Sequence, residues 1–340
     1  MDPFKITEAQ DRAAWLDARR TGLGGSDIAA VLGVSPYRTP VSVYLDKIEG
    51  STYEESEAAH WGKMLEDVVA KEFQQRTGMK VQRVNSILRA GEDGWMIANI
   101  DRAIVNPSIA KSVRLLTPQK QELTGRMLST DVILECKTAS QYLADQWGPS
   151  QEAEICAGES VSDYKIPCYY ETQVQWYMGV TGASTAYVAV LIGGQDFRMY
   201  RVDRDDELIE GIRAICREFW KEHILKQVPP KPVNFADVKR LFPKENGEMI
   251  EASNDLATAI GEYRTLTAQI KDLTAKKDGY ATQIAEAIGD AEGVLIGGEK
   301  AATFKAVTTR RFDSTRFKKS DPVVWAEYLT ETTDRRLRVF

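Results

Sequence analysis

The stretch from residue 131 to residue 140, DVILECKTAS, joins an apolar run to an acid and a base two positions apart. Its aliphatic residues favour a β-strand, whose side chains alternate between the two faces of a sheet. Glu135 and Lys137 therefore share one face, and Cys136 points to the other. The pair is either a salt bridge at the end of a strand or half of a metal site, and residues elsewhere in the chain decide between these.

The composition is that of a globular protein. The 340 residues are 43% hydrophobic and 28% charged, and the length is enough for two domains or one domain with appendages. No apolar run approaches the roughly 20 residues of a membrane-spanning helix. The first twenty residues are charged and lack the apolar core of a signal peptide, so we expect a cytoplasmic protein without membrane contact.

The counts of histidine, cysteine and charge exclude several functional classes. His60 and His223 are the only histidines, which nearly excludes a histidine-based triad or a multi-histidine metal site. The four cysteines show no CxxC pairing, so reduced thiols are expected. A net charge of −6 argues against a nonspecific binder of nucleic acid, although it leaves room for an enzyme with a local basic groove.

Helices and strands alternate up to about residue 230, which predicts an α/β sandwich. We expect helices over residues 8–20, 27–32, 41–47, 60–78, 168–182 and 205–226, with Ser26 as the N-cap of the second. Strands are expected near 80–89 and 95–105, at DVILECKTAS, and as a hairpin over 186–192 and 196–202. Residues 106–128 are expected to form an inserted loop, and a further loop is expected around 147–165.

The character of the chain changes after Pro232. A heptad-like seam predicts a helical hairpin or a coiled coil, and its members are Ala259, Tyr263, Leu266, Ile270, Leu273, Lys277, Tyr280, Ile284 and Ala287. Residues 293–307 then predict a small β-hairpin. The expected division is therefore a first domain over 1–230 and a C-terminal helical and β extension over 231–340.

Two further carboxylates raise the significance of the Glu135–Lys137 pair. Asp101 follows an apolar stretch 34 residues before Glu135. Glu66 lies on the face of its expected helix that carries Val69 and Phe73, three and seven residues further on. A carboxylate on a face that points to the core is costly unless it is paired or binds a metal.

Three carboxylates and a lysine on an α/β core suit metal-assisted hydrolysis of a phosphodiester. Mg²⁺ or Mn²⁺ prefers oxygen ligands, and two such ions activate a water and stabilise the leaving oxygen. Lys137 could position the water or neutralise the charge that develops on phosphorus. Asp131 shares the face of Glu135 but lies roughly 13 Å away along the strand, so we interpret it as structural.

Five segments in this order resemble the lambda-type phage exonucleases with the YqaJ-like viral recombinase domain, within the PD-(D/E)xK nuclease superfamily. They are ARRTGLGGSDIAAVLG, WGKMLEDVV, ANIDR, ILECKTAS and YYETQVQWYM, and they extend over about residues 12 to 200. The resemblance implies a restriction-endonuclease-like core, in which helices flank a central mixed sheet.

The resemblance also implies roles for individual residues. Asp101, Glu135 and the backbone carbonyl of Cys136 would be metal ligands, and Glu66 would lie at the position of a second ion. Lys137 would be the catalytic lysine. One departure from the family is that Asp101 is followed by arginine where glycine is usual, and another is the longer gap between Asp101 and Glu135.

Three more residues match family positions outside the carboxylate cluster. Gln173 would help to hold the site and its water, and Arg19 and Ser26 would grip the terminal 5′-phosphate of DNA. A guanidinium gives bidentate phosphate contacts, and a Gly-Gly-Ser turn that enters a helix offers free amides. The alternative is a plain capped helix with solvated arginines.

The function that the resemblance implies is metal-dependent 5′→3′ digestion of one strand of double-stranded DNA, which leaves a 3′ tail. It further implies a ring-shaped homo-trimer and cooperation with a single-strand annealing protein in phage recombination, in the host cytoplasm. Two alternatives stay open: an endonuclease of restriction or resolvase type, and a non-catalytic scaffold that binds DNA ends.

Overall fold

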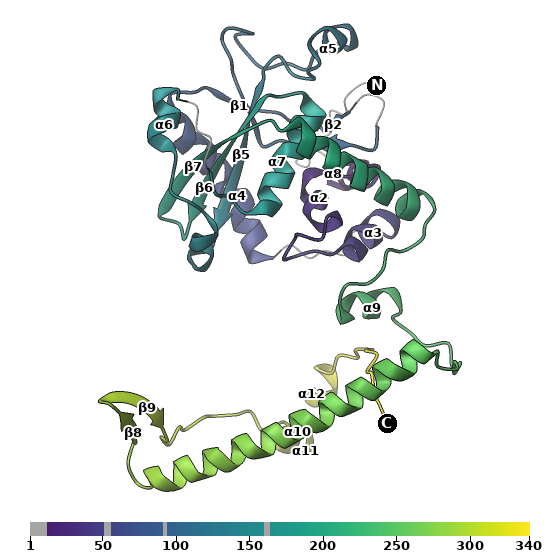
Figure 1. Ribbon diagram of the computed structural model, residues 1–340, viewed down its shortest axis with the longest axis vertical. Coiled ribbons are helices and arrows are strands. Elements are labelled where there is room, and N and C mark those ends of the chain that lie inside the picture. The colour runs from purple at the N-terminus through teal and green to yellow at the C-terminus, as the bar shows by residue number, and fades with distance from the viewer. Residues whose placement is uncertain (1–11, 51–55, 91–93, 160–163) are drawn as a thin grey trace. The chain divides into compact units, whose positions relative to one another are not determined.

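A computed structural model describes residues 12–50, 56–90, 94–159 and 164–340. The chain divides into two compact units, one that ends at Leu241 and one that begins at Phe242 (Figure 1). No helix among the described residues is long and apolar enough to cross a membrane.

The first unit is built on a five-stranded mixed sheet. Only β5 and β6 pair in parallel, and the remaining neighbours are antiparallel. The strand order is β1 (Val81–Arg83), β4 (Arg102–Ile104), β5 (Val132–Ala139), β6 (Thr185–Ile192) and β7 (Asp196–Asp203). The strand that contains Glu135 is therefore the central one, with Glu135 opposite Val188 of β6.

Helices cover both faces of this sheet, which confirms the expected α/β core. Among them, α4 packs on one face and α7 on the other. The α-helices that the structure describes in this unit are α1 (Arg12–Arg20), α2 (Gly25–Val31), α3 (Pro40–Ile48), α4 (Glu57–Thr77), α5 (Pro118–Thr124), α6 (Glu152–Ala157), α7 (Cys168–Thr181), α8 (Asp206–Phe219) and α9 (Phe235–Leu241). A 3₁₀ turn, η1 (Gln141–Gln146), follows β5, and a π-helical segment, η2 (Trp220–Leu225), extends α8.

The faces of β5 alternate as expected from a strand. Leu134 and Cys136 pack with Val69 and Phe73 of α4. Ile133 belongs instead to the larger core, which includes α2, α7 and α8. Glu135 and Lys137 have the parity of Ile133, so they face α7.

Several local expectations were wrong. The strands expected over 80–89 and 95–105 are short pieces, because β2 (Leu88–Arg89) and β3 (Ile97–Ala98) form a separate small ribbon. The loops expected over 106–128 and 147–165 contain α5 and α6. Signals for α5 were present in the sequence, since Thr117 is its N-cap, Pro118 its first residue and Gly125 its left-handed C-cap.

Ser26 is not the N-cap of α2. The helix begins two residues earlier than expected, at Gly25, with Gly24 as the N-cap. The capping contact is made from inside the helix, where the side chain of Asp27 accepts a hydrogen bond of 3.0 Å from the Gly24 amide. The hydroxyl of Ser26 is thereby left for another contact. The segment 8–11 of the first expected helix lies outside the described residues.

The second unit is dominated by one uninterrupted helix, α10 (Asn254–Ile288). The expected helical hairpin was therefore wrong, whereas the β-hairpin of β8 (Gly293–Ile296) and β9 (Glu299–Thr303) is confirmed. Two short helices, α11 (Ser314–Ser320) and α12 (Pro322–Glu327), follow.

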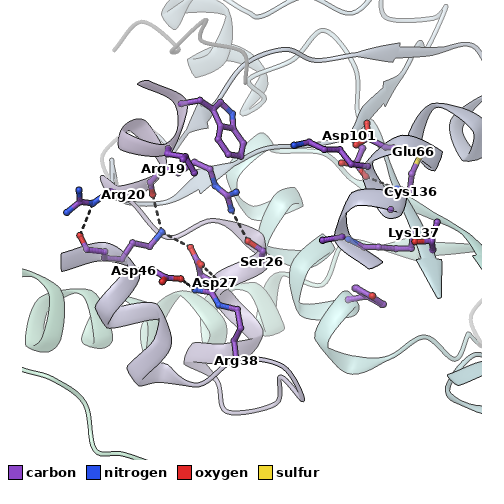
Figure 2. A pocket seen from close by; sticks show the side chains of 18 of the residues that line it. Arg19, Arg20, Ser26, Asp27, Arg38, Asp46, Glu66, Asp101, Cys136 and Lys137 are labelled. Atoms are coloured by element: carbon purple, nitrogen blue, oxygen red, sulfur yellow. Dashed lines mark hydrogen bonds and ion pairs between the residues drawn. The ribbon is translucent and has the colours of Figure 1, made fainter. Parts of the chain in front are cut away.

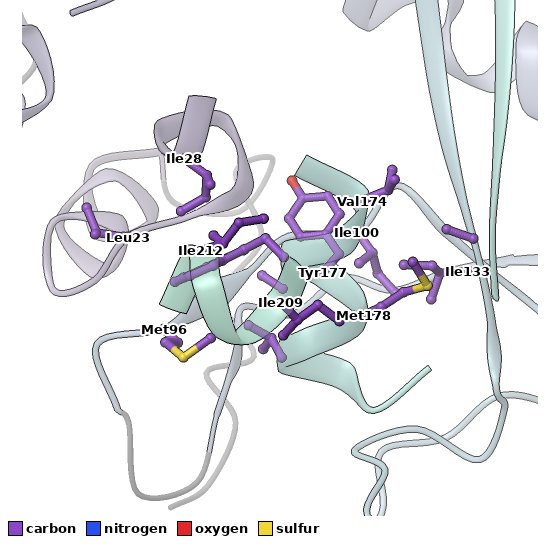
Figure 3. Close-up of a cluster of buried hydrophobic side chains, with 14 of the residues drawn as sticks. Leu23, Ile28, Met96, Ile100, Ile133, Val174, Tyr177, Met178, Ile209 and Ile212 are labelled. Carbon is purple, nitrogen blue, oxygen red and sulfur yellow. The ribbon is translucent and has the colours of Figure 1, made fainter. Parts of the chain in front are cut away.

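Helix α2 packs closely against α7, and α7 lies on the face of the sheet that carries Glu135. Figure 3 shows Ile28 of α2 and Tyr177 of α7 in the same apolar cluster, with Ile209 and Ile212 of α8 beside them. Gly25 lies at the closest approach, because a Cβ atom there would be 2.4 Å from the Tyr177 ring. A side chain at this position has to displace the tyrosine.

Gly25→Ala is expected to lower the free energy of unfolding by about 1–3 kcal/mol, the usual cost of overpacking a core. Gly211→Ala is the matched control, since this exposed glycine of α8 has open space around its Cβ position. Higher helix propensity should make the control neutral or more stable by up to about 1 kcal/mol. Urea unfolding measures both, and equal midpoints for the two variants would contradict the packing argument.

Candidate active site

The carboxylate of Glu135 is buried between β5 and α7, with only 3% of the residue exposed. Its Oε1 atom accepts hydrogen bonds from Lys137 Nζ at 2.6 Å and from Gln173 Nε2 at 2.7 Å. Lys137 Nζ also donates to Gln173 Oε1 at 3.2 Å, so the three side chains form a closed triangle. The Oε2 atom is buried and has no hydrogen-bond partner among the residues that the structure describes.

Asp101 lies next to this triangle, in the turn just before β4. Its Oδ2 atom accepts a hydrogen bond of 2.9 Å from the backbone amide of Cys136. Burial raises the pKa of Asp101 well above its ordinary value, and the nearby charges of Glu135 and Glu66 raise it further. The single strand expected over 95–105 is divided, because β3 ends at Ala98 and β4 begins at Arg102, and Asp101 lies between them. It is nevertheless beside Glu135, as the sequence predicted.

Lys137 is a cation at this site. Burial alone would lower the pKa of its ammonium, but Glu135 and Asp101 raise it above the ordinary value. The Nζ atom also lies 4.8 Å from the centre of the Tyr170 ring. A protonated lysine can stabilise negative charge or donate a proton, whereas it cannot act as a general base.

Glu66 forms an ion pair with Arg102, the residue that stands where glycine is usual in the family. Arg102 is buried, and its Nη1 atom donates to Glu66 Oε1 and to the carbonyl oxygen of Asp101, both at 2.6 Å. Its Nη2 atom donates to Asp67. The arginine therefore fixes the carboxylate of Glu66 and the main chain at Asp101.

Arg19 and Ser26 form the second group of predicted residues. Arg19 Nη2 donates to Ser26 Oγ at 2.9 Å, and the guanidinium lies over the ring of Trp15. The neighbouring Arg20 is directed elsewhere, because it donates to the carbonyl oxygens of Lys47 and Ile48.

A buried ion network supports the loop between Arg19 and Ser26. Asp27 accepts hydrogen bonds from Lys47 Nζ at 2.7 Å and from Arg38 Nη1 at 2.8 Å. Lys47 Nζ also donates to the carbonyl oxygen of Arg19 at 3.0 Å. Burial alone would raise the pKa of Asp27, but the two cations hold it far below its ordinary value.

One cavity joins the two groups of predicted residues. Its volume is about 830 Å³, and Figure 2 shows Arg19 and Ser26 on one side of it and the carboxylate cluster on the other. The site residues that line it are Arg19, Ser26, Glu66, Asp101, Cys136 and Lys137. Gln173 and Glu135 lie beneath this lining, where they hold Lys137.

The donor set fits a hard divalent cation. Glu135 has a buried oxygen that no described residue hydrogen-bonds, and Asp101 and Glu135 repel each other. Within the described ranges, no three His, Cys, Asp or Glu side chains are already gathered to hold a metal ion. The contacts explain why, since Arg102 holds Glu66 and Lys137 holds one oxygen of Glu135.

Asp27→Asn is expected to lower the free energy of unfolding by about 3–5 kcal/mol at neutral pH, because it leaves Lys47 and Arg38 without their buried counter-charge. The folded pKa is depressed, so this stabilisation is complete above the unfolded pKa of about 4 and is lost as the pH falls below it. Denaturant unfolding between pH 7 and pH 3 measures the free energy of unfolding of both proteins. The difference between wild type and variant should become smaller below about pH 4.

Asp17→Asn is the control for this measurement. Asp17 is exposed and only 3.9 Å from Arg20, and such pairs contribute less than about 1 kcal/mol. A gap for Asp27→Asn that stayed constant down to pH 3 would contradict the depressed pKa.

The sequence of this chain resembles those of known proteins. A family profile described as the YqaJ-like viral recombinase domain matches residues 14–184. A protein of Bacillus subtilis (strain 168) named "Uncharacterized protein YqaJ" is 35% identical over 337 residues, which are 96% of this chain and 94% of that protein.

Solved structures give weaker likenesses. LHK-Exo, an alkaline exonuclease from Laribacter hongkongensis, is 18% identical with a TM-score of 0.42, and covers 63% of this chain and 96% of its own. A phage-related exonuclease from Haemophilus somnus 129PT is 13% identical with a TM-score of 0.40, and covers 61% and 96%. The family match and the Bacillus relative are sufficient by themselves: the chain belongs to the YqaJ-like viral recombinase family.

Proposed function

We propose that the protein is a metal-dependent 5′→3′ exonuclease that digests one strand of double-stranded DNA from an end and leaves a 3′ single-stranded tail for recombination. The observation that carries the proposal is the cavity that joins the Arg19–Ser26 pair to Asp101 and to Lys137, whose ammonium is held by Glu135 beneath the lining. An end-specific nuclease needs a grip for the terminal phosphate and a hydrolytic centre within the same cleft. Membership of a viral recombinase family supports the same assignment.

The residues that would hold Mg²⁺ or Mn²⁺ are Asp101, Glu135 and the carbonyl of Cys136, with Glu66 at the position of a second ion. When bound, such ions activate water and stabilise the leaving oxygen of a phosphodiester. Asp101 lines the cavity and Glu135 lies beneath its lining, and the charge of neither carboxylate is fully compensated. Oxygen donors are the ligands that these ions prefer.

Lys137 supplies the electrostatic contribution of the protein itself. Its ammonium stays protonated beside Glu135, so it can neutralise the charge that develops on the reacting phosphate. Gln173 holds both partners of this ion pair and also donates to Tyr177 OH at 3.1 Å. The glutamine thereby fixes the direction in which the ammonium points.

The Arg19–Ser26 pair supplies the selectivity for a 5′ end. A guanidinium offers several N–H donors in one plane, which match the oxygens of a terminal phosphate. The Asp27 network holds the backbone on both sides of this pair, so the grip is organised before DNA arrives. A ring-shaped homo-trimer and a single-strand annealing partner complete the proposal, since a 3′ tail is the substrate for annealing.

Digestion of labelled DNA tests the activity. With Mg²⁺, the wild-type protein should degrade linear duplexes from the end at which a strand has its 5′ terminus, and faster when that terminus carries a phosphate. It should leave covalently closed circles intact. Lys137→Ala should reduce the rate by about 10²–10³-fold, as the loss of one charge-stabilising donor does. Arg19→Ala should remove the preference for the phosphorylated end.

Lys71→Ala is the control for both variants, since Lys71 is an exposed residue of α4 that does not line the cavity. Cutting of closed circles would favour an endonuclease, and no metal-dependent release of nucleotides would sink the proposal. Equal rates with and without the 5′-phosphate would remove the role of Arg19 and Ser26 alone.

Thermal unfolding tests metal binding without reference to activity. Mg²⁺ at a hundredfold excess over its dissociation constant should stabilise the folded protein by about 2.7 kcal/mol and raise Tm. Glu135→Gln should abolish most of this increase, measured against its own metal-free Tm. Asp131→Asn is the control, because Asp131 accepts a hydrogen bond from Asn106 and is away from the cavity. An unchanged Mg²⁺ effect in Glu135→Gln would exclude Glu135 as a ligand.

A further inference from the structure

Helix α10 carries an apolar seam on its surface. Every residue from Gly261 to Ile284 is exposed, although the seam repeats in steps of three and four. One row of the seam is Leu256, Tyr263, Ile270, Lys277 and Ile284, and the other is Ala259, Leu266, Leu273, Tyr280 and Ala287. An exposed stripe of this length marks an interaction surface, and its spacing is that of a helix that packs against another helix.

The polar residues that flank the seam identify the partner. On one side Glu262 and Lys276 lie seven residues before and seven residues after Gln269. A second identical helix that runs antiparallel, with its Gln269 beside this one, brings each Glu262 against Lys276 of the second copy. The charge pattern is thus complementary to itself about a two-fold axis, which is the requirement for contact between two copies of one chain.

Lys277 distinguishes the two directions of pairing. Two parallel helices in register would place Lys277 against Lys277 inside the seam, and would leave Glu262 opposite Thr267 without a charged partner. The antiparallel register places Lys277 opposite Ala259 of the second copy. The small alanine leaves room for the lysine stem to extend to solvent, so the charge does not have to be buried.

We propose that α10 pairs with α10 of a second copy of this chain as an antiparallel coiled coil centred on Ala268. The pairing is independent of the carboxylate site, because all of its residues lie on α10. It doubles whatever assembly the first unit forms, including the ring-shaped trimer of the proposed function.

Disulfide trapping in the full-length protein tests the direction. The exposed thiols of Cys156 and Cys168 are first removed by substitution with serine. Gln269→Cys should then form a covalent pair of chains under mild oxidation, because the antiparallel register places the two positions side by side. Lys277→Cys is the matched control, which only a parallel pair would cross-link.

Charge reversal tests the register by light scattering and sedimentation. Glu262→Lys should weaken the association of two copies roughly tenfold, because like charges replace both Glu–Lys pairs. The double variant Glu262→Lys with Lys276→Glu should restore wild-type association. Lys271→Glu, on the opposite side of α10, should leave it unchanged.

Ile270→Asp should halve the mass of the assembly, while circular dichroism checks that the helix persists. Cross-linking through Lys277→Cys in place of Gln269→Cys would overturn the antiparallel arrangement in favour of a parallel bundle. An assembly whose mass is the same for wild type and Ile270→Asp would overturn the pairing itself.

Discussion

The buried carboxylate of Glu135 is the constraint around which the first unit is organised. It lies on the central strand, where a charge is costly unless hydrogen bonds and opposite charge compensate it. Lys137 and Gln173 satisfy one of its oxygens, and the other has no hydrogen-bond partner in the part of the chain that the structure describes. Helix α7 brings Gln173 there, and Gly25 lets α2 pack closely against α7 at Tyr177 and Gln173. The packing of the apolar core thus holds a polar side chain, Gln173, beside Glu135.

The charge of a second buried carboxylate, Asp27, is fully compensated by neighbouring cations. It receives hydrogen bonds from Lys47 and Arg38 together, and its pKa falls although burial opposes this. Glu135 has a single cation, and burial raises its pKa. The contrast separates a structural ion network at Asp27 from a carboxylate at Glu135 whose charge is only partly compensated. Lys47 also links this network to the main chain at Arg19, whereas one oxygen of Glu135 has no hydrogen-bond partner among the described residues.

Sequence patterns predicted what depends on neighbours along the chain. Alternation along one strand placed Glu135 and Lys137 together and turned Cys136 to the opposite core. Contacts between distant segments were not accessible in this way. The hydrogen bond from Arg102 to Glu66 joins residues 36 positions apart in the sequence. It depends on where β4 lies relative to α4 in the folded chain. The N-cap of α2 was misplaced by two residues, because Asp27 competes with Ser26 as a capping side chain.

Arg102 changes how charge is distributed among the three carboxylates. Where a glycine follows the aspartate, nothing from that position can reach Glu66, whereas here a buried guanidinium lies 2.6 Å from it. Arg102 therefore supplies a fixed positive charge beside Glu66, whereas Asp101 and Glu135 repel each other. If metal ions bind as we propose, an ion that used Glu66 as a ligand would have to share that carboxylate with Arg102. The position between Asp101 and Glu135 would then have the stronger demand for a cation.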